Sequence, residues 1–368
     1  EGLNREGDGF RRIVVEKPFG YDLSSALELN RIYLDAFREE QIYRIDHFLG
    51  KETVQNILAL RFANSVFEPL WNRNYIDYVE ITAVENMGIG TRGGFYDGVG
   101  TLRDMVQNHL AQLLAVTAME PPAAFDASGF RNEVVKVYQS LTPLTGEDIR
   151  HSVVRGQYMA SEGRKGYREE EQVPALSRTE TYLAMRLELN NWRWGGVPFY
   201  IRTGKQMPTK VSEIVIHFKP APYSLFRCEG GTCPVPNRLV IRIQPNEGIV
   251  LRLGMKKPGE GFEVLPMDMD FSYAELGRLP TEDAYARLIE DCIAGDPTLF
   301  IRSDAAESGW RFFDPILKYW QDVPECPLYG YPAGSWGPLE ADSLMARHGA
   351  SWTNPCKNLT NTHLYCEL

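Results

Sequence analysis

Hydrophobic and polar residues alternate in several short runs along the chain. Alternation over roughly four to eight residues is typical of a strand with one buried face. The first clear run, YVEITAVE, covers residues 78–85, and later ones are YLAMRLEL, VSEIVIHF, RLVIRIQP, IVLRLGM and FEVLPMDMDF. Few helical segments separate the later runs, which indicates a large, mainly antiparallel sheet.

Helical periodicity marks the segments that we expect to pack on this sheet. Apolar residues three or four positions apart predict a helix that starts near Gly50 and a long helix over residues 101–119. DAYARLIEDCIAG and SGWRFFDPILKYW have the same periodicity further along. We therefore predict an α+β fold in which helices cover the large sheet.

The N-terminal segment has a different character. RRIVVEKPFG is a short β-branched run that ends in proline and glycine, as a buried parallel strand does, and a helical pattern follows over residues 22–37. No further strand–helix units follow. These residues therefore predict only a small piece of an open α/β sheet.

The composition limits the possible partners. The chain has 368 residues and a formal net charge of −10, which argues against nucleic acid or an anionic membrane as partner. No apolar run approaches the ~18 residues that span a bilayer, and the first residues do not have the pattern of a secretory signal. Six cysteines do not form a disulfide framework in a chain of this length. We expect a cytoplasmic protein, with Cys228 and Cys233 as ordinary thiols in a turn.

GIGTRG, residues 88–93, matches the glycine pattern of dinucleotide-binding turns. In those turns the third glycine lies in the helix that faces the pyrophosphate. Here GFYDGVG follows, and we expect no helix before residue 101. The segment is therefore predicted to be a hairpin loop and not the coenzyme site.

RIDHFLGKE, residues 44–52, concentrates charged and polar chemistry around one glycine. Lys51 lies at the expected start of a helix, where free N–H groups and a positive charge suit a phosphate dianion. His47 can add a hydrogen-bond donor. Asp46 cannot usefully face the same phosphate, so its expected role is to accept a hydrogen bond from another imidazole.

His109 is the candidate for that imidazole. It lies on the apolar face of the predicted long helix, where a lone histidine is most often a core residue. Its polar neighbours Arg103, Asp104, Gln107 and Asn108 favour a catalytic role instead. A carboxylate that holds a histidine as general base can remove a proton from a hydroxyl near neutral pH.

A metal site is the rival interpretation of the same residues. It would use Asp46, His47, Asp104 and His109. Lys17 and Lys51 would repel a divalent cation, and no close His or Cys spacing supports one, so we predict no metal. Lys17 itself ends the first strand. A cis bond to Pro18 could aim it into a crevice, but the sequence taken alone favours a simple strand-terminating turn.

These motifs together resemble the glucose-6-phosphate dehydrogenase family. The resemblance extends in order from about residue 11 to 348, and it rests on VVEKPFG, YRIDHFLGKETVQNI, RFAN, WNR, RDMVQNHL, VPFYIRTGK, IRIQPNE, KKPG and DAYARLIED. It implies oxidation of glucose 6-phosphate at C1 by NADP to 6-phosphoglucono-δ-lactone, the first step of the oxidative pentose phosphate pathway.

The resemblance also assigns roles to individual residues. It implies that His109 is the base, that Asp46 orients it, and that His47 and Lys51 bind the phosphate. Lys17 is expected between substrate and nicotinamide, which makes it both a substrate and a cofactor residue. The other residues expected on the substrate side are the acids Glu85 and Asp104, the lysines Lys205 and Lys210, and, as a weaker match, Gln244.

Two features depart from the family pattern. Phe48 replaces the usual tyrosine, which removes one phosphate contact worth about 1 kcal/mol. The glycine-rich coenzyme turn and most of the Rossmann sheet have no counterpart here. We therefore expect residues 1–45 to be a remnant of the NADP-binding Rossmann domain, residues 46–368 to form the C-terminal substrate-binding and dimerisation domain, and the chain alone to be inactive. The tail 351–368 also has no recognisable counterpart.

Asp104 and His109 raise a geometric problem. Residues five apart lie about 140° apart around a regular α-helix, so the two side chains should not reach one small sugar. We predict a π-bulge or an irregular first turn between them.

The family also implies a homodimer or a dimer of dimers through the large sheet. Two other hypotheses remain open. One is a non-catalytic sugar-phosphate-binding or assembly module, which would have no need of His109 or Asp46. The other is a lumenal hexose-6-phosphate dehydrogenase, which the cysteine-poor sequence disfavours. The preference for NADP over NAD cannot be predicted from these residues.

Overall fold

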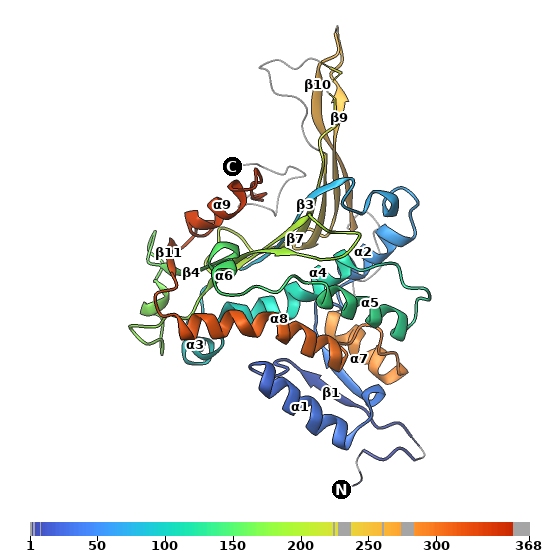
Figure 1. Ribbon diagram of the computed structural model, residues 1–368, viewed down its shortest axis with the longest axis vertical. Helices are drawn as coiled ribbons and strands as arrows, with labels where there is room; N and C mark the ends of the chain where they lie inside the picture. The colour runs from blue at the N-terminus through green and yellow to red at the C-terminus, as the bar shows by residue number, and fades with distance from the viewer. Residues whose placement is uncertain are drawn as a thin grey trace.

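The computed structural model describes residues 2, 4–7, 9–223, 225–226, 237–259, 261–273 and 283–355 (Figure 1). Cys228, Cys233 and most of the tail 351–368 lie outside these residues, so the predictions about them are not tested. Among the described residues, no helix is both long and apolar enough to cross a bilayer.

The N-terminal segment forms one strand–helix–strand unit. Strand β1 (Ile13–Glu16), helix α1 (Leu23–Ala36) and strand β2 (Ile42–Ile45) follow one another, and the strands pair in parallel. Asp22 caps the helix by accepting a hydrogen bond from the Ser25 N–H, as the sequence suggests. Strand β2 was not predicted, because its four residues contain a buried arginine and lead directly into the polar site motif.

The large sheet has nine strands in the order β10-β9-β8-β7-β3-β6-β5-β4-β11. Most pairs are antiparallel, and only β3–β6 and β4–β11 are parallel, which confirms the predicted architecture. The strands are β3 (Ile76–Val84), β4 (Val153–Met159), β5 (Tyr182–Glu188), β6 (Pro198–Gly204), β7 (Val211–Phe218), β8 (Arg238–Gln244), β9 (Gly248–Lys256), β10 (Val264–Ser272) and β11 (Tyr329–Pro332).

Helices cover most of one face of this sheet, and a smaller cluster covers the other face (Figure 1). The main core lies between the sheet and the helices α2 (Glu52–Phe62), α4 (Ala111–Ala118), α5 (Ala127–Gln139), α7 (Ala284–Ala294) and α8 (Ser303–Asp322). The opposite face is rich in tyrosine and packs against α9 (Leu339–Ala346) and Trp352. Helix α6 (Glu147–Ser152) precedes β4.

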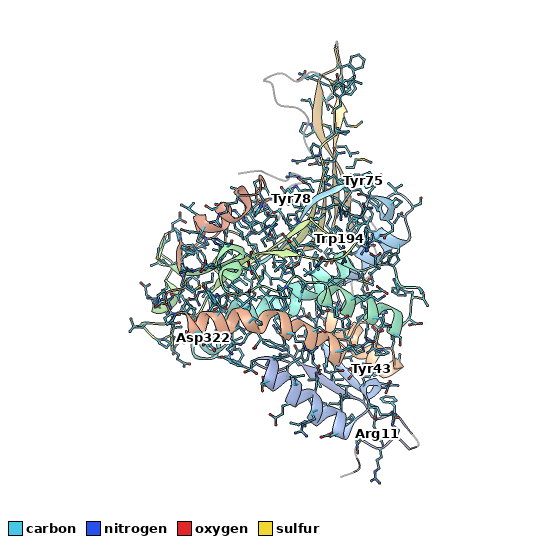
Figure 2. The ribbon with its side chains drawn as sticks, in the orientation of Figure 1. Arg11, Tyr43, Tyr75, Tyr78, Trp194 and Asp322 are labelled. Carbon is cyan, nitrogen blue, oxygen red and sulfur yellow. The ribbon has the colours of Figure 1, made fainter. Side chains whose placement is uncertain are left out.

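Buried side chains satisfy the carbonyl groups at the end of α4. The Trp71 indole N–H donates to the Thr117 carbonyl, and the Trp194 indole N–H donates to the Ala118 carbonyl. Arg61, fully buried, donates to the carbonyls of residues 116, 117 and 119. Trp194 lies within the body of the protein, where Figure 2 labels it. These contacts fix the helix that carries the site, because unsatisfied carbonyls at a buried helix end are costly.

The predicted hairpin loop at residues 88–93 is wrong. A short 3₁₀ turn, Gly90–Arg92, leads directly into helix α3 (Gly93–Thr101). The glycine-rich sequence GGFYDGVGT has low helix propensity, but burial of Tyr96 against the tyrosine-rich face favours the helix. Strand β3, which precedes the turn, pairs in parallel with β6 and antiparallel with β7.

Candidate active site

Three elements meet around His109. Lys17 follows β1, Asp46 and His47 follow β2, and the helix after α3 carries Asp104 and His109. The carboxyl ends of β1 and β2 therefore both point toward His109, as ligand-binding ends of parallel strands do. The Lys17–Pro18 peptide is cis.

Asp46 and His109 form the centre of the site. Asp46 Oδ1 lies 2.6 Å from His109 Nδ1 and also accepts a hydrogen bond of 3.0 Å from the Phe48 N–H. Both side chains are buried. Burial alone raises the pKa of Asp46, but His109 and the Phe48 N–H outweigh it and hold that pKa below its ordinary value. Asp46 is therefore placed, as a carboxylate, to accept a hydrogen bond from the imidazole of His109.

Lys17 occupies the other side of the imidazole. Its Nζ lies 3.0 Å from His109 Nε2, 2.9 Å from the Asp104 carbonyl oxygen and 3.3 Å from Asp104 Oδ1. An ammonium group can only donate, so Nε2 is an acceptor and the ring proton resides on Nδ1, facing Asp46. Nε2 is thus the atom available to accept a substrate proton.

The helix that carries Asp104 and His109 is a π-helix. The segment η4 (Leu102–Leu110) has this geometry throughout, between α3 and α4. A π-helix brings residues i and i+5 to one side, whereas an α-helix separates them by about 140°. The prediction of an irregular helix between Asp104 and His109 is therefore confirmed, and Lys17 contacts both residues.

Cationic groups gather at the start of α2. Lys51 is the N-cap residue of this helix, and its Nζ donates to Gln244 Oε1 at 2.5 Å. Burial is the main cause that lowers the pKa of Lys51, while Glu247 acts in the opposite direction. Lys210 is exposed, and its charge contributes to the lower pKa of Lys51. The site thus places a lysine beside free helix N–H groups, an arrangement that suits an anion.

His47 is held between rings. It lies edge-on to His109, with ring centroids 4.6 Å apart, and stacks on Tyr285 at 5.7 Å. Burial and the nearby His109 lower the pKa of His47 to about 4, so its ring is neutral near pH 7. Its Nδ1 is buried without a hydrogen-bond partner among the described residues. His47 can therefore serve a ligand as a neutral hydrogen-bonding group.

Two acids and a lysine complete the site on the side of β6. Lys205, just after β6, lies 2.5 Å from Glu85 Oε2 and 3.7 Å from Asp104 Oδ2. Burial opposes ionisation of Asp104, but Lys17 and Lys205 hold the pKa of Asp104 below its ordinary value. Both acids are thus placed to accept hydrogen bonds from hydroxyl groups.

The structure brings together nine of the ten predicted residues, including the weaker match Gln244, and Lys210 lies at the exposed margin. Two aromatic residues were missed as site components. Phe48, noted only as a departure from the family, stacks on His109 with ring centroids 4.6 Å apart, and Tyr285 stacks on His47. DAYARLIED contains Tyr285, but nothing in that motif indicates a contact with His47, which lies more than 200 positions earlier.

Asp46, His47 and His109 could also serve as metal ligands by distance. Their ligand atoms all lie within 4.8 Å of one another. However, Asp46 and His109 are hydrogen-bonded to each other, and Lys17 is bonded to the other nitrogen of His109. The cationic surroundings favour an anionic or hydroxylated ligand over a metal ion.

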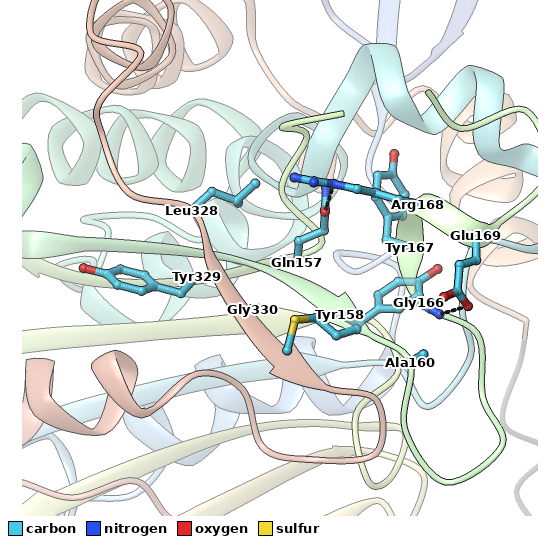
Figure 3. A pocket seen from close by; sticks show the side chains of 11 residues that line it. Gln157, Tyr158, Ala160, Gly166, Tyr167, Arg168, Glu169, Leu328, Tyr329 and Gly330 are labelled. Carbon is cyan, nitrogen blue, oxygen red and sulfur yellow. Dashed lines mark hydrogen bonds between the residues drawn. The ribbon is translucent and has the colours of Figure 1, made fainter. Parts of the chain in front are cut away.

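A separate hollow of about 310 Å³ lies at the β4–β11 edge of the sheet (Figure 3). Its lining includes Gln157, Tyr158, Tyr167, Arg168 and Tyr329, and none of the predicted site residues. Tyr158 and Tyr167 already donate their hydroxyl groups to Glu170 and Asp97. The site around His109 is thus distinct from this hollow.

Two family models together match most of the chain. The chain matches the family model "Glucose-6-phosphate dehydrogenase, NAD binding domain" over residues 1–56. It then matches "Glucose-6-phosphate dehydrogenase, C-terminal domain" over residues 58–353. A nucleotide-binding segment joined to a large-sheet domain with a histidine–aspartate pair places the chain among the dehydrogenases.

Individual relatives extend over nearly the whole chain. Glucose-6-phosphate 1-dehydrogenase of Aggregatibacter actinomycetemcomitans is 54% identical over 96% of this chain and 71% of the relative. That of Treponema pallidum is 50% identical over 100% of this chain and 72% of the relative.

Solved structures agree with these relatives. A structure of glucose-6-phosphate dehydrogenase in complex with its substrate glucose-6-phosphate has a TM-score of 0.88, at 36% identity over 95% of this chain and 71% of that one. Glucose-6-phosphate 1-dehydrogenase from Mycobacterium avium has a TM-score of 0.79, at 39% identity over 94% and 71% of the two chains. The chain belongs to the glucose-6-phosphate dehydrogenase family, which confirms the predicted family and α+β fold.

Proposed function

We propose that this chain oxidises glucose 6-phosphate at C1 to 6-phosphoglucono-δ-lactone, with His109 as the base that accepts the C1 hydroxyl proton. The observation that carries the proposal is the chain of contacts Asp46–His109–Lys17, in which Nε2 faces the site as an acceptor. Asp46 fixes the tautomer before the reaction and stabilises the imidazolium that forms. A substrate hydroxyl reaches Nε2 when it takes the place of the Lys17 ammonium.

The coenzyme of this family is NADP, which takes up the hydride from C1 when it is bound. The residues present fit NADP bound beside the base. Lys17 directly follows β1, at the end where parallel strands bind ligands, and its Nζ lies 3.0 Å from His109 Nε2. Lys17 would contact both the substrate and the nicotinamide. Asp104 balances its positive charge.

The remaining residues bind and orient the sugar phosphate. We assign the phosphate to Lys51, His47 and the N-terminus of α2, with Lys210 at the margin. We assign the sugar hydroxyls to Glu85 and Asp104, both of which lie beside Lys205. His47 links the two groups of residues, because its ring lies edge-on to that of His109 with centroids 4.6 Å apart.

Calorimetric titration tests the binding part of this proposal. We expect glucose 6-phosphate to bind the chain and Lys51→Ala to weaken binding at least about tenfold, the effect of losing one charge-assisted contact. Lys219→Ala, which removes a lysine outside the site, is the matched control. Turnover is followed by NADPH formation with His109→Asn as the inactive reference. Binding without turnover would agree with the expectation that the chain alone is inactive, whereas no binding of glucose 6-phosphate would contradict the proposal.

We also propose that two copies associate through the β9–β10 end of the sheet, which projects from the body (Figure 1). One face of β10 carries apolar side chains that are 37–64% exposed, namely Leu265, Met267, Met269 and Phe271. On the other face Asp268 pairs with Arg252, and Asp270 with Arg242. An apolar face on an edge strand is unfavourable in water, and a second copy can cover it.

Light scattering on the purified chain tests this association. We expect the mass of a dimer, or of a dimer of dimers, and a monomer for the double variant Met267→Lys, Met269→Lys. Leu176→Lys, at a residue that is 87% exposed away from the hairpin, should leave the mass unchanged. A monomeric wild type would contradict the proposal.

Two further proposals concern domains and compartment. Strand β2 ends at Ile45, directly before Asp46, so we propose that residues 1–45 serve the coenzyme and residues 46–368 serve the substrate and the dimer. Cys292 and Cys326 are free thiols, which fits a reducing compartment such as the cytoplasm.

A further inference from the structure

The π-helix η4 needs an explanation of its own. Its i to i+5 geometry is rare beyond a single turn and is less favourable than an α-helix, so other contacts must hold it in place. It extends over Leu102–Leu110 and lies between two α-helical segments. In a regular α-helix Asp104 and His109 would point about 140° apart and could not both contact Lys17. The contacts that fix the π-helix therefore control the arrangement of the site.

The first contact lies inside the helix. The Asn108 side-chain amide Nδ2 donates a hydrogen bond of 2.6 Å to the Arg103 carbonyl oxygen. The bond joins residues five apart, the same spacing as in a π-helix, so it forms only when residue 108 lies over residue 103. Asp104 directly follows Arg103, and His109 directly follows Asn108, so the same register places Asp104 and His109 one above the other. Because Asn108 is 3% exposed, water cannot replace its amide.

The second contact lies at the start of the helix. Glu180 Oε1 accepts a hydrogen bond of 3.0 Å from the Leu102 N–H, and the Glu180 carbonyl accepts one from the Thr101 hydroxyl. Gly100 makes the approach possible: its φ is +74°, and a Cβ atom there would lie 2.5 Å from Glu180 Oε1. Glu180 is thus a buried carboxyl group that the proposed reaction does not use and that fixes where the π-helix begins.

We propose that Asn108 and Glu180 are positioning residues, which hold the π-helical register that places Asp104 and His109 together. The expected loss of affinity for the substrate rests on the proposed function, whereas the expected shift of the helix does not. Neither residue contacts the groups assigned to the phosphate. Loss of either contact is therefore expected to disturb the sugar end of the site and to leave the phosphate end intact.

The test uses Asn108→Leu, which has nearly the same shape but no donor. We expect residues 102–110 of its crystal structure to shift toward an α-helix, with Asp104 away from Lys17. We expect affinity for glucose 6-phosphate to fall about 10- to 100-fold, the usual effect of an ångström-scale misplacement. Affinity for inorganic phosphate, measured by ³¹P NMR, should stay within about twofold. A purely structural role would not separate these two affinities.

Three further variants keep the test decisive. Gln112→Leu removes a buried amide from the regular helix α4 and should change neither affinity. Glu180→Gln keeps the acceptor and should behave as wild type, whereas Glu180→Leu should reproduce Asn108→Leu. If Asn108→Leu does not fold, Asn108→Ala, which also removes the donor and occupies less space, replaces it.

An Asn108→Leu variant that keeps the π-helix and both affinities would overturn the proposal. A wild type that does not bind glucose 6-phosphate would contradict the proposed function only. In that case the crystallographic comparison would still decide whether Asn108 sets the register.

Discussion

The proton on His109 is controlled from both sides of the ring. Asp46 accepts from Nδ1 at 2.6 Å, and Lys17 donates to Nε2 at 3.0 Å. Asp46→Asn keeps the shape but can present an N–H to the ring, which favours the other tautomer. We expect kcat to fall about 10²- to 10⁴-fold, the range for loss of general-base catalysis, with little change in KM.

The ring proton itself provides a check that does not need turnover. In the wild type the Nδ1–H shared with Asp46 should give a strongly downfield proton NMR signal, and this signal should vanish in Asp46→Asn. His348→Gln, at an unrelated histidine, is the control and should retain it. An Asp46→Asn enzyme with normal kcat would refute the assignment of His109 as base.

His47 makes stability depend on pH. Burial lowers its pKa in the folded protein to about 4, from an ordinary value of 6.5. Between these values the unfolded chain binds the proton more strongly, so the free energy of unfolding should fall as pH falls from 6.5 to 4. His47→Gln removes this contribution. Urea unfolding at several pH values should show a shallower decline for the variant, and parallel curves would exclude the effect.

The chemistry of individual residues was predictable where it is local in sequence. Lys51 beside Gly50, and Asp46 before His47, could be assigned from helix-terminus and general-base chemistry. The bond from Lys51 to Gln244 and the stacking of Tyr285 on His47 join residues about 190 to 240 positions apart. Nothing local determines such contacts, because they depend on how β8 and α7 pack against the site.

At the scale of elements, Gly50 determines how closely α7 approaches the phosphate end of the site. A Cβ atom on Gly50 would lie 2.5 Å from the Ala284 carbonyl oxygen and 3.0 Å from Leu288 Cγ. Gly50→Ala should therefore push α7 away and lower the free energy of unfolding by about 1–3 kcal/mol, a typical effect of overpacking. Glucose 6-phosphate binding should weaken with it.

Gly98→Ala is the matched control, because a Cβ atom there would meet nothing within 4 Å. It lies inside α3, where alanine is the better helix former, so we expect unchanged or slightly higher stability. Chemical denaturation and calorimetry measure both variants. Equal behaviour of the two would show that the loop around Gly50 adjusts without cost.

Elements with strong periodicity were predicted, and elements defined by tertiary packing were not. Helix α1 and strands β7 to β10 follow the sequence pattern closely. Strand β2 is too short for a periodic signal, and α3 forms despite four glycines because Tyr96 is buried. The π-helix is an intermediate case: the sequence alone indicated an irregularity only because the two side chains had to reach one ligand.

At the scale of the whole molecule, the chain returns to the sheet near its end. Residues after 350 have no recognisable counterpart in the family pattern, yet Trp352, Thr353 and Asn354 lie on the tyrosine-rich face. Arg202, fully buried in β6, donates to Asn354 Oδ1 at 2.8 Å and to the Thr353 carbonyl at 3.1 Å. Trp352 covers the same guanidinium group at 4.5 Å.

Glu80, a buried acid of β3, also depends on residues 351–355. Glu80 of β3 accepts hydrogen bonds of 2.8 Å from the Thr353 N–H and hydroxyl, and its Oε1 lies 2.5 Å from His217 Nε2. Tyr78, labelled in Figure 2, stacks on His217 at 4.0 Å. Residues 351–355 therefore supply hydrogen-bond partners to two buried charged residues, Arg202 and Glu80.

A chain shortened to end at Ala350 should leave those charges without these partners. Each lost hydrogen bond to a charged group costs about 1.5–3 kcal/mol, so the free energy of unfolding should fall by at least about 3 kcal/mol. The control chain ends at Pro355 and retains every contact just described. Chemical denaturation compares the two. Because β6 carries Arg202 and ends just before Lys205, the shorter chain should also bind glucose 6-phosphate more weakly. Equal stability of both chains would contradict the prediction. It would show that Arg202 and the buried pair Glu80–His217 have sufficient partners within the sheet itself.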